Sequence, residues 1–568
     1  MEASSYPLDR ARLATLIDAL IARAEHGDVH AARQAVALTQ GRDPIRAARA
    51  LACAVALNPR DDDSRLALAR LRAGSGDLNA ARREAETVLE TALDEAARAQ
   101  AALALGDVAR LEAAYAEARG HYEDVIAIED AILAAHPGEP TALRWRARAM
   151  GRVAELDLIG ENPAAAQQRA RAARDILRAL ALQLSETPLL AADIADAELR
   201  LAEIALAEGR PTAMRPFLEQ ALGRYEALAV HEKAEPHWRD RLAECWALMA
   251  EAALAEGAAA EARVAMDKAV SQRVWLANKE PGERWGLAAI WRLRAGLMAA
   301  LREEQAAADS LDQAAALAEK LCAEADNASE AARFLFHTRL EQADLGLRMG
   351  DLKRARDAAD RARAEAEAFA RQDPAWRTDL AAAWDRLGDI AKTVSAAEQA
   401  EDAFARAVEL RRMSAAEQDS MSLKRALAAA LLKFGEAAMD ANAPGAARGA
   451  FAESFALRLE LAEAYPGALA PAQDLAVALE RLGLSAAAEG DLAGARAAWE
   501  QELSLVESIF PEGDEAGLRF CAIVDALLAD LGGDQADAHR QRAREKLARI
   551  RALTAEDAAL AARLASDF

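Results

Sequence analysis

The chain has 568 residues, of which 53% are apolar but only 4% aromatic, and its 93 acidic and 70 basic residues leave a net charge of −23. This acidity argues against nucleic acid as a partner, because the field repels phosphate backbones and no basic stripe interrupts it. We find no secretory signal, no apolar run long enough to span a bilayer and no C-x-x-C pair among the four cysteines. These features predict a cytoplasmic protein without membrane insertion, and the excess of Ala and Leu predicts helices.

The first helix is expected from Leu8 to Ala24. From residue 28 onward, a small residue recurs within an apolar pattern of helical period. Successive recurrences lie 34 and 37 residues apart at first, and 43 to 48 residues apart afterwards. We call these small residues markers. They are Ala35, Ala69, Gly106, Ala154, Ala202, Ala250, Ala295, Ala343, Gly388, Gly435, Gly483 and Ala526.

Three late segments show the pattern around a marker in full: Leu380–Gly388, Leu427–Gly435 and Leu475–Gly483. Twelve residues after each Gly comes an Ala, and four residues later a large side chain, Phe or Trp. This pattern resembles the tetratricopeptide repeat family, in which two antiparallel helices approach closely at small residues. A bulky residue then fills the gap where the next repeat stacks.

The resemblance implies an all-α fold, a right-handed α-solenoid of about eleven to twelve helix-turn-helix repeats with terminal capping helices. The wider marker spacing adds about two turns to each helix, similar to the long-helix tetratricopeptide arrays of bacterial proteins. We therefore expect four segments. They are an N-terminal capping helix (1–27), two repeats of ordinary length (28–98), long-helix repeats (99–503), and a degenerate repeat with a capping helix (504–568).

Helix termini are predicted from glycine and aspartate. A Gly supplies the positive φ that a helix end needs, and an Asp after it caps the following helix. This pair occurs at Gly76-Asp77, Gly350-Asp351, Gly490-Asp491 and Gly533-Asp534. Thr554, with Glu and Asp in the turn that follows, is predicted to cap the last helix.

No residue pattern predicts an enzyme, a metal site or a cofactor. The chain lacks a phosphate-binding loop, a nucleophile elbow and metal-ligand spacing. Cys245 and Cys521 both lie five residues before a marker, which favours packing over reactivity. Trp246, Trp291 and Trp384 all lie four residues before a marker, which favours core packing over a ligand platform.

An acidic residue directly follows the marker in seven repeats. In the family that the chain resembles, this position lines the concave face of the superhelix, so the resemblance implies a ladder of carboxylates along a groove. Two interpretations remain open: a groove that binds a basic peptide, or a solvated polar face. The seven residues are Asp107, Glu155, Glu203, Glu251, Asp344, Asp389 and Glu436.

The function expected from this architecture is a non-catalytic scaffold or adaptor that binds one or more proteins or peptides. The alternative is a sensor or regulatory subunit that controls a separate effector enzyme through a partner- or ligand-dependent change in the solenoid. Homo-oligomerisation stays open, because Ala-rich repeat faces can self-associate. No motif identifies the partner.

Overall fold

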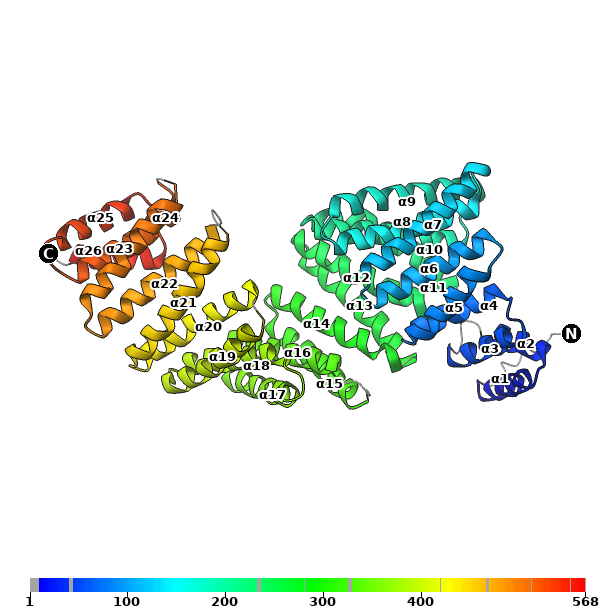
Figure 1. The fold of residues 1–568 in the computed structure, drawn as a ribbon, viewed down its shortest axis with the longest axis horizontal. Coiled ribbons are helices and arrows are strands. Elements are labelled where there is room, and N and C mark those ends of the chain that lie inside the picture. The colour runs from blue at the N-terminus through cyan, green and yellow to red at the C-terminus, as the bar shows by residue number, and fades with distance from the viewer. Residues whose placement is uncertain are drawn as a thin grey trace. The chain divides into compact units, whose positions relative to one another are not determined.

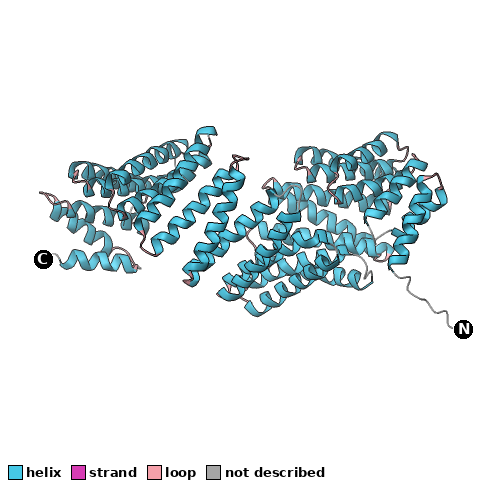
Figure 2. Ribbon diagram, turned by 90° about the horizontal axis from the view of Figure 1, so that it is seen from below, coloured by secondary structure: helices cyan, strands magenta, loops and turns pink. Residues whose placement is uncertain are grey.

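The computed structural model describes residues 10–39, 44–231, 236–279, 281–324, 329–418, 420–465, 469–511, 513–551 and 553–566. These residues form 26 α-helices and two short 3-10 helices, with no β-strand among them (Figures 1 and 2). The prediction of an all-α repeat protein is therefore confirmed. The chain divides into two compact units, Met1–Glu303 and Glu304–Phe568. The marker spacing continues through residue 303, so no sequence boundary was predicted there.

The first unit contains fourteen of the described helices, coloured blue to green in Figure 1. They are α1 (Arg10–Glu25), α2 (Val29–Thr39), α3 (Pro44–Leu57), α4 (Asp62–Gly74), α5 (Leu78–Thr91), α6 (Glu95–Leu111), α7 (Tyr115–Ala135), α8 (Pro140–Ile159), α9 (Pro163–Leu184), α10 (Pro188–Ala207), α11 (Arg215–His231), α12 (Pro236–Ala255), α13 (Ala259–Lys279) and α14 (Arg284–Ala300). The two 3-10 helices, Pro211–Ala213 and Pro281–Glu283, precede α11 and α14.

The second unit contains the other twelve. They are α15 (Glu304–Glu324), α16 (Ser329–Met349), α17 (Leu352–Ala370), α18 (Trp376–Thr393), α19 (Ala397–Glu417), α20 (Met421–Asp440), α21 (Pro444–Ala464), α22 (Leu469–Ala488), α23 (Leu492–Ile509), α24 (Glu515–Asp530), α25 (Ala536–Ala548) and α26 (Ala555–Ser566).

One marker lies on every even-numbered helix from α2 to α24, and all twelve markers are buried. We call these helices the marker helices. Within each unit, a marker helix packs against the odd-numbered helix that follows it, as α8 does on α9 and α18 on α19. The arrangement is that of a tetratricopeptide-type helical repeat. Helices α1 and α26 pack at the two ends of the described chain, on α2 and α25. Leu8, the predicted start of the first helix, lies outside the described residues.

The helices lengthen where the marker spacing widens. Helices α2 to α5 have 11 to 14 residues, whereas α6 to α13 have 17 to 22. Asp77, Asp351 and Asp491 cap the helices that follow them by accepting backbone N–H bonds, as predicted. The prediction for Asp534 is wrong. Two consecutive glycines with positive φ lengthen that turn, and Gln535 occupies the N-cap position instead.

The last helix begins with a reciprocal cap. The Thr554 hydroxyl accepts the backbone N–H of Asp557 at 3.1 Å, and the Asp557 carboxylate accepts the N–H of Thr554 at 2.8 Å. Two backbone donors that the helix cannot pair are thereby satisfied. The N-cap predicted at Thr554 is confirmed.

Glycine markers pack against aromatic rings. Gly106, Gly388, Gly435 and Gly483 each face the ring of the residue sixteen positions later, and an added Cβ would lie under 3.0 Å from that ring. The rings belong to Tyr122, Phe404, Phe451 and Trp499. In the eight repeats whose marker is Ala, the residue sixteen positions later is never aromatic. The four repeats with a Gly marker thus match the smallest marker to an aromatic neighbour, which keeps the helix pair densely packed.

Candidate functional site

The seven predicted acidic residues lie on seven marker helices, one residue after a buried marker. Four are in the first unit, on α6, α8, α10 and α12, and three are in the second, on α16, α18 and α20. Each side chain is partly exposed. The marker fixes this position, because a buried residue on a helix places its neighbour at the edge of the packed face.

Basic residues two positions before the markers complete the arrangement, and the sequence analysis missed them. Residues three apart lie on the same face of a helix, so a cation at this position stands beside the acid of its own helix. It also contacts the acid of the preceding marker helix. We call each such pair of positions on consecutive marker helices a rung. A rung is closed when an ion pair joins its two side chains and open when the second position carries no cation. Five rungs are closed by an ion pair: Asp107–Arg152 (3.1 Å), Glu155–Arg200 (2.9 Å), Asp344–Arg386 (2.6 Å), Asp389–Lys433 (2.9 Å) and Glu436–Arg481 (3.3 Å).

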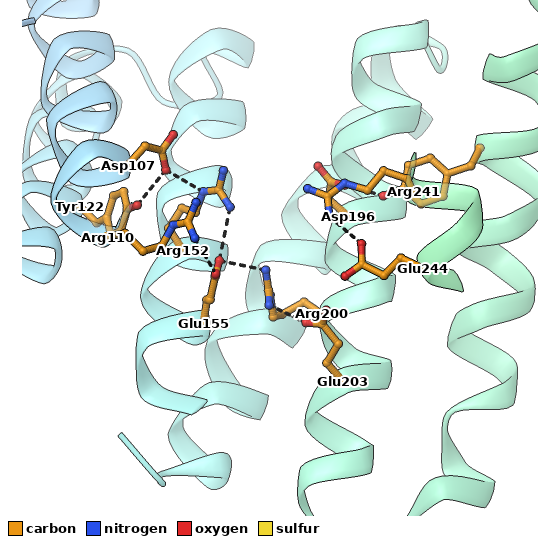
Figure 3. Close-up of polar contacts among 11 residues, drawn as sticks. Asp107, Arg110, Tyr122, Arg152, Glu155, Asp196, Arg200, Glu203, Arg241 and Glu244 are labelled. Carbon is orange, nitrogen blue, oxygen red and sulfur yellow. Dashed lines mark hydrogen bonds and ion pairs between the residues drawn. The ribbon is translucent and has the colours of Figure 1, made fainter. Parts of the chain in front are cut away.

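Glu155 shows how a closed rung behaves. It lies between Arg152 at 3.3 Å and Arg200 at 2.9 Å, with Arg110 at 3.4 Å (Figure 3). Burial opposes its ionised form, but Arg200, Arg152 and Arg110 outweigh burial and lower its pKa. The carboxylates therefore do not form a row of unmatched like charges. Acids and bases alternate along the ladder instead.

Further polar contacts hold the ladder of the first unit in place. The Tyr122 hydroxyl donates to Asp107 at 2.8 Å, and the Tyr225 hydroxyl donates to Asp196. Asp196 in turn lies 3.7 Å from Arg241, which binds Glu244 at 2.8 Å (Figure 3). A cavity of about 70 Å³ opens beside these residues and is lined by Arg152, Asp196, Arg200 and Arg241, among others. The charged groups are thus held in place by contacts within the chain.

Two rungs of the first unit are open. Leu248 and Leu293 occupy the positions from which a cation would reach Glu203 and Glu251. Glu203 pairs only with Arg200 of its own helix among the described residues. Burial, helped by the nearby carboxylates of Glu244 and Glu155, raises the pKa of Glu203 to about 7.

Glu251 has no hydrogen bond or ion pair within the described part of the chain, and burial raises its pKa. A carboxylate that lacks a counter-charge in a partly buried position favours its neutral form. The two open rungs are therefore places where a cation would be stabilising.

Converting a closed rung into an open one tests this description. In Arg200→Leu, Glu155 loses its nearest cation, so its pKa should rise and the folded state should lose about 1–2 kcal/mol at pH 8. The loss should be smaller at pH 5, where Glu155 of the variant can take up a proton. Urea unfolding at the two pH values measures the difference, and an equal loss at both would contradict the role of Arg200.

No group of three or more His, Cys, Asp or Glu side chains in the described ranges could hold a metal ion. Cys245 and Cys521 are buried, and burial raises the pKa of both thiols, as expected of packing residues. Trp246, Trp291 and Trp384 are only partly buried, and each carries a Lys or Arg over its ring. Within the described residues, no helix is both long and apolar enough to cross a membrane.

No protein-family model matches the chain, and no curated protein matches it. Several solved structures are similar. Yeast Tom70 is 12% identical and aligns over 93% of this chain and 99% of its own, with a TM-score of 0.34. Human IFIT1, crystallised as a dimer with m7Gppp-AAAA, is 13% identical over 88% of this chain and 96% of its own, with a TM-score of 0.33. BtubC from P. vanneervenii is 18% identical over 44% of this chain and 92% of its own, with a TM-score of 0.35. At these TM-scores the likeness does not extend to function.

Proposed function

We propose that this tetratricopeptide-type repeat is a non-catalytic protein-interaction scaffold that holds a partner along the rungs of its marker helices. One observation carries the proposal. Within each unit, partly exposed charged side chains run across consecutive marker helices and are held in place by ion pairs. Such a row can contact an extended stretch of another protein, and its preorganisation lowers the entropic cost of binding.

The chemistry favours a protein with basic side chains over other ligands. With a net charge of −23, the chain attracts cationic segments and repels nucleic acid. All four cysteines are free, which supports a reducing compartment such as the cytoplasm. The proposed contact residues are the seven carboxylates that follow the markers.

Affinity capture from native lysate at low and moderate salt, followed by mass spectrometry, tests the scaffold function. We expect a discrete protein, more strongly retained at low salt. Carbodiimide crosslinking of the purified pair should then join partner amines to carboxylates on the even-numbered helices. Retention of no protein at either salt, or crosslinks confined to the odd-numbered helices, would overturn the proposal.

A further inference from the structure

The face that the last marker helix of the first unit turns to the ladder has no charge at the ladder positions themselves. On α14, the positions that carry charge in other repeats hold Ala289, Leu293 and Gly296. Leu293 is 51% exposed, although it is a large apolar side chain. This face adjoins α12, whose Glu251 is without a partner among the described residues. An exposed leucine beside an unmatched carboxylate marks a surface suited to a ligand that is both apolar and cationic.

The chain itself indicates what is missing from this surface. In all five closed rungs, the residue that pairs with the acid is an Arg or Lys on the next marker helix. At the two open rungs, the next marker helix carries a leucine instead, Leu248 on α12 and Leu293 on α14. A lysine or arginine from another protein would restore the contact, and its aliphatic stem would lie on the leucine.

We propose that the open rungs, Glu203 with Leu248 and Glu251 with Leu293, bind a partner segment that carries two basic residues flanking an aliphatic one. This inference rests on the proposed scaffold function and gives it a location and a partner chemistry. Neighbouring helices lie roughly 8–10 Å apart, and an extended chain advances about 3.3 Å per residue. The two basic residues are therefore about three positions apart in an extended segment.

Binding is coupled to protonation of Glu203. Arg200 and Arg241 favour its ionised form, whereas burial, Glu155 and Glu244 favour the neutral one, and its pKa lies at about 7. A bound cation requires the ionised form, so the segment displaces a proton. Affinity should therefore rise as the pH increases through 7, and this dependence should be absent in Glu203→Gln.

The probe is a fluorescein-labelled 12-residue peptide with Lys-Leu-Ser-Lys at its centre. Its binding to the full-length chain is measured by anisotropy. Three comparison peptides replace both lysines with glutamate, replace the leucine with serine, or place the lysines side by side. We expect the first peptide to bind most tightly, since it alone matches the charge, the spacing and the apolar side chain that the open rungs require.

The variant Glu203→Gln/Glu251→Gln should weaken binding at least tenfold. It should not unfold the chain, because it removes two carboxylates that burial already disfavours. The matched control is Glu219→Gln/Glu226→Gln, which removes the same charge from exposed positions on α11 and should bind as the natural chain does. In Leu248→Arg/Leu293→Arg, the chain supplies its own cations, and peptide binding should be lost while the fold is stabilised.

The outcomes separate this inference from the scaffold function. Equal loss in the two glutamine variants, or unchanged binding in the arginine variant, would overturn the location. Binding of none of the four peptides would overturn the proposed chemistry of the partner. The scaffold function would then be tested only by the affinity capture from lysate. A captured partner whose affinity is unchanged in Glu203→Gln/Glu251→Gln would contradict the inference and leave the scaffold function intact.

Discussion

Gly435→Ala is expected to destabilise the repeat of α20 and α21 by about 1–3 kcal/mol, although alanine is the better helix former. The added methyl group would meet the Phe451 ring at under 3.0 Å, and that ring is buried and cannot move aside freely. Because repeats unfold locally, hydrogen exchange of peptides from these two helices is the suitable measurement. We expect faster exchange there than in helices α6 to α10.

Gly449 provides the matched control. It lies inside α21, is exposed, and has nothing within 4 Å of an added Cβ. Gly449→Ala should therefore stabilise the same repeat by up to about 1 kcal/mol. The double variant Gly435→Ala/Phe451→Leu should recover most of the lost stability, because the chain already pairs Ala202 with Leu218 at these positions. If both single glycine variants change stability in the same direction, the steric argument is wrong.

Glu502→Ala is expected to stabilise the C-terminal repeats, with an effect on the order of 4 kcal/mol near pH 7.5. Glu502 on α23 is fully buried, and neither carboxylate oxygen has a hydrogen-bond partner among the described residues. Burial, with a contribution from Glu480, raises its pKa to about 9. In the eight preceding long repeats, the residue at this position is small or of medium size and buried. These residues are Val125, Ala173, Ala221, Ala269, Ala314, Ala362, Ala407 and Ser454.

The pH dependence follows from the direction of the shift. A carboxyl group whose pKa is higher in the folded than in the unfolded state opposes folding only where the unfolded chain is ionised. The penalty is absent below the ordinary glutamate pKa, grows as the pH rises towards 9, and is complete above it. Unfolding of the natural chain and of Glu502→Ala should therefore converge near pH 4 and diverge at pH 8.

Glu502→Gln separates charge from volume, since it keeps the size of the side chain but cannot ionise. Its stability should not fall between pH 5 and 8, in contrast to that of the natural chain. A natural chain whose C-terminal hydrogen exchange shows no more pH dependence than the Gln variant would contradict a neutral, buried Glu502.

The helix pairs could be predicted from the sequence because their signal is local and repeated. Ala202 and Gly435 each stand inside one apolar helical pattern, and Asp351 caps a helix that begins beside it. Of the ladder, only the acidic residues were predicted, because the sequence was examined for acidic residues directly after the markers and not for basic residues before them. Arg200 stands in the same frame as Glu203, three residues before it, and its partner Glu155 is 45 residues away on another helix. A search for complementary charge between successive repeats would have found it.

Other features depend on packing that no single pattern contains. Glu502 resembles an exposed helical glutamate in sequence, and only its position nineteen residues after Gly483 shows that it is buried. The division after Glu303 leaves no trace in marker spacing or composition, because the same repeat continues on both sides.

The closed rungs also bear on how such a chain evolves. Each of α18 and α20 carries a base that pairs with the acid of the preceding marker helix. Each also carries an acid that pairs with the base of the following marker helix. Removal of one whole copy, from Gly388 to the residue before Gly435, would leave Arg386 against Asp344 and Glu436 against Arg481, so opposite charges would stay together. Duplication of a copy would do the same. The array can therefore gain or lose units without a compensating mutation. A repeat that has Leu293 in place of the base interrupts the series of ion pairs.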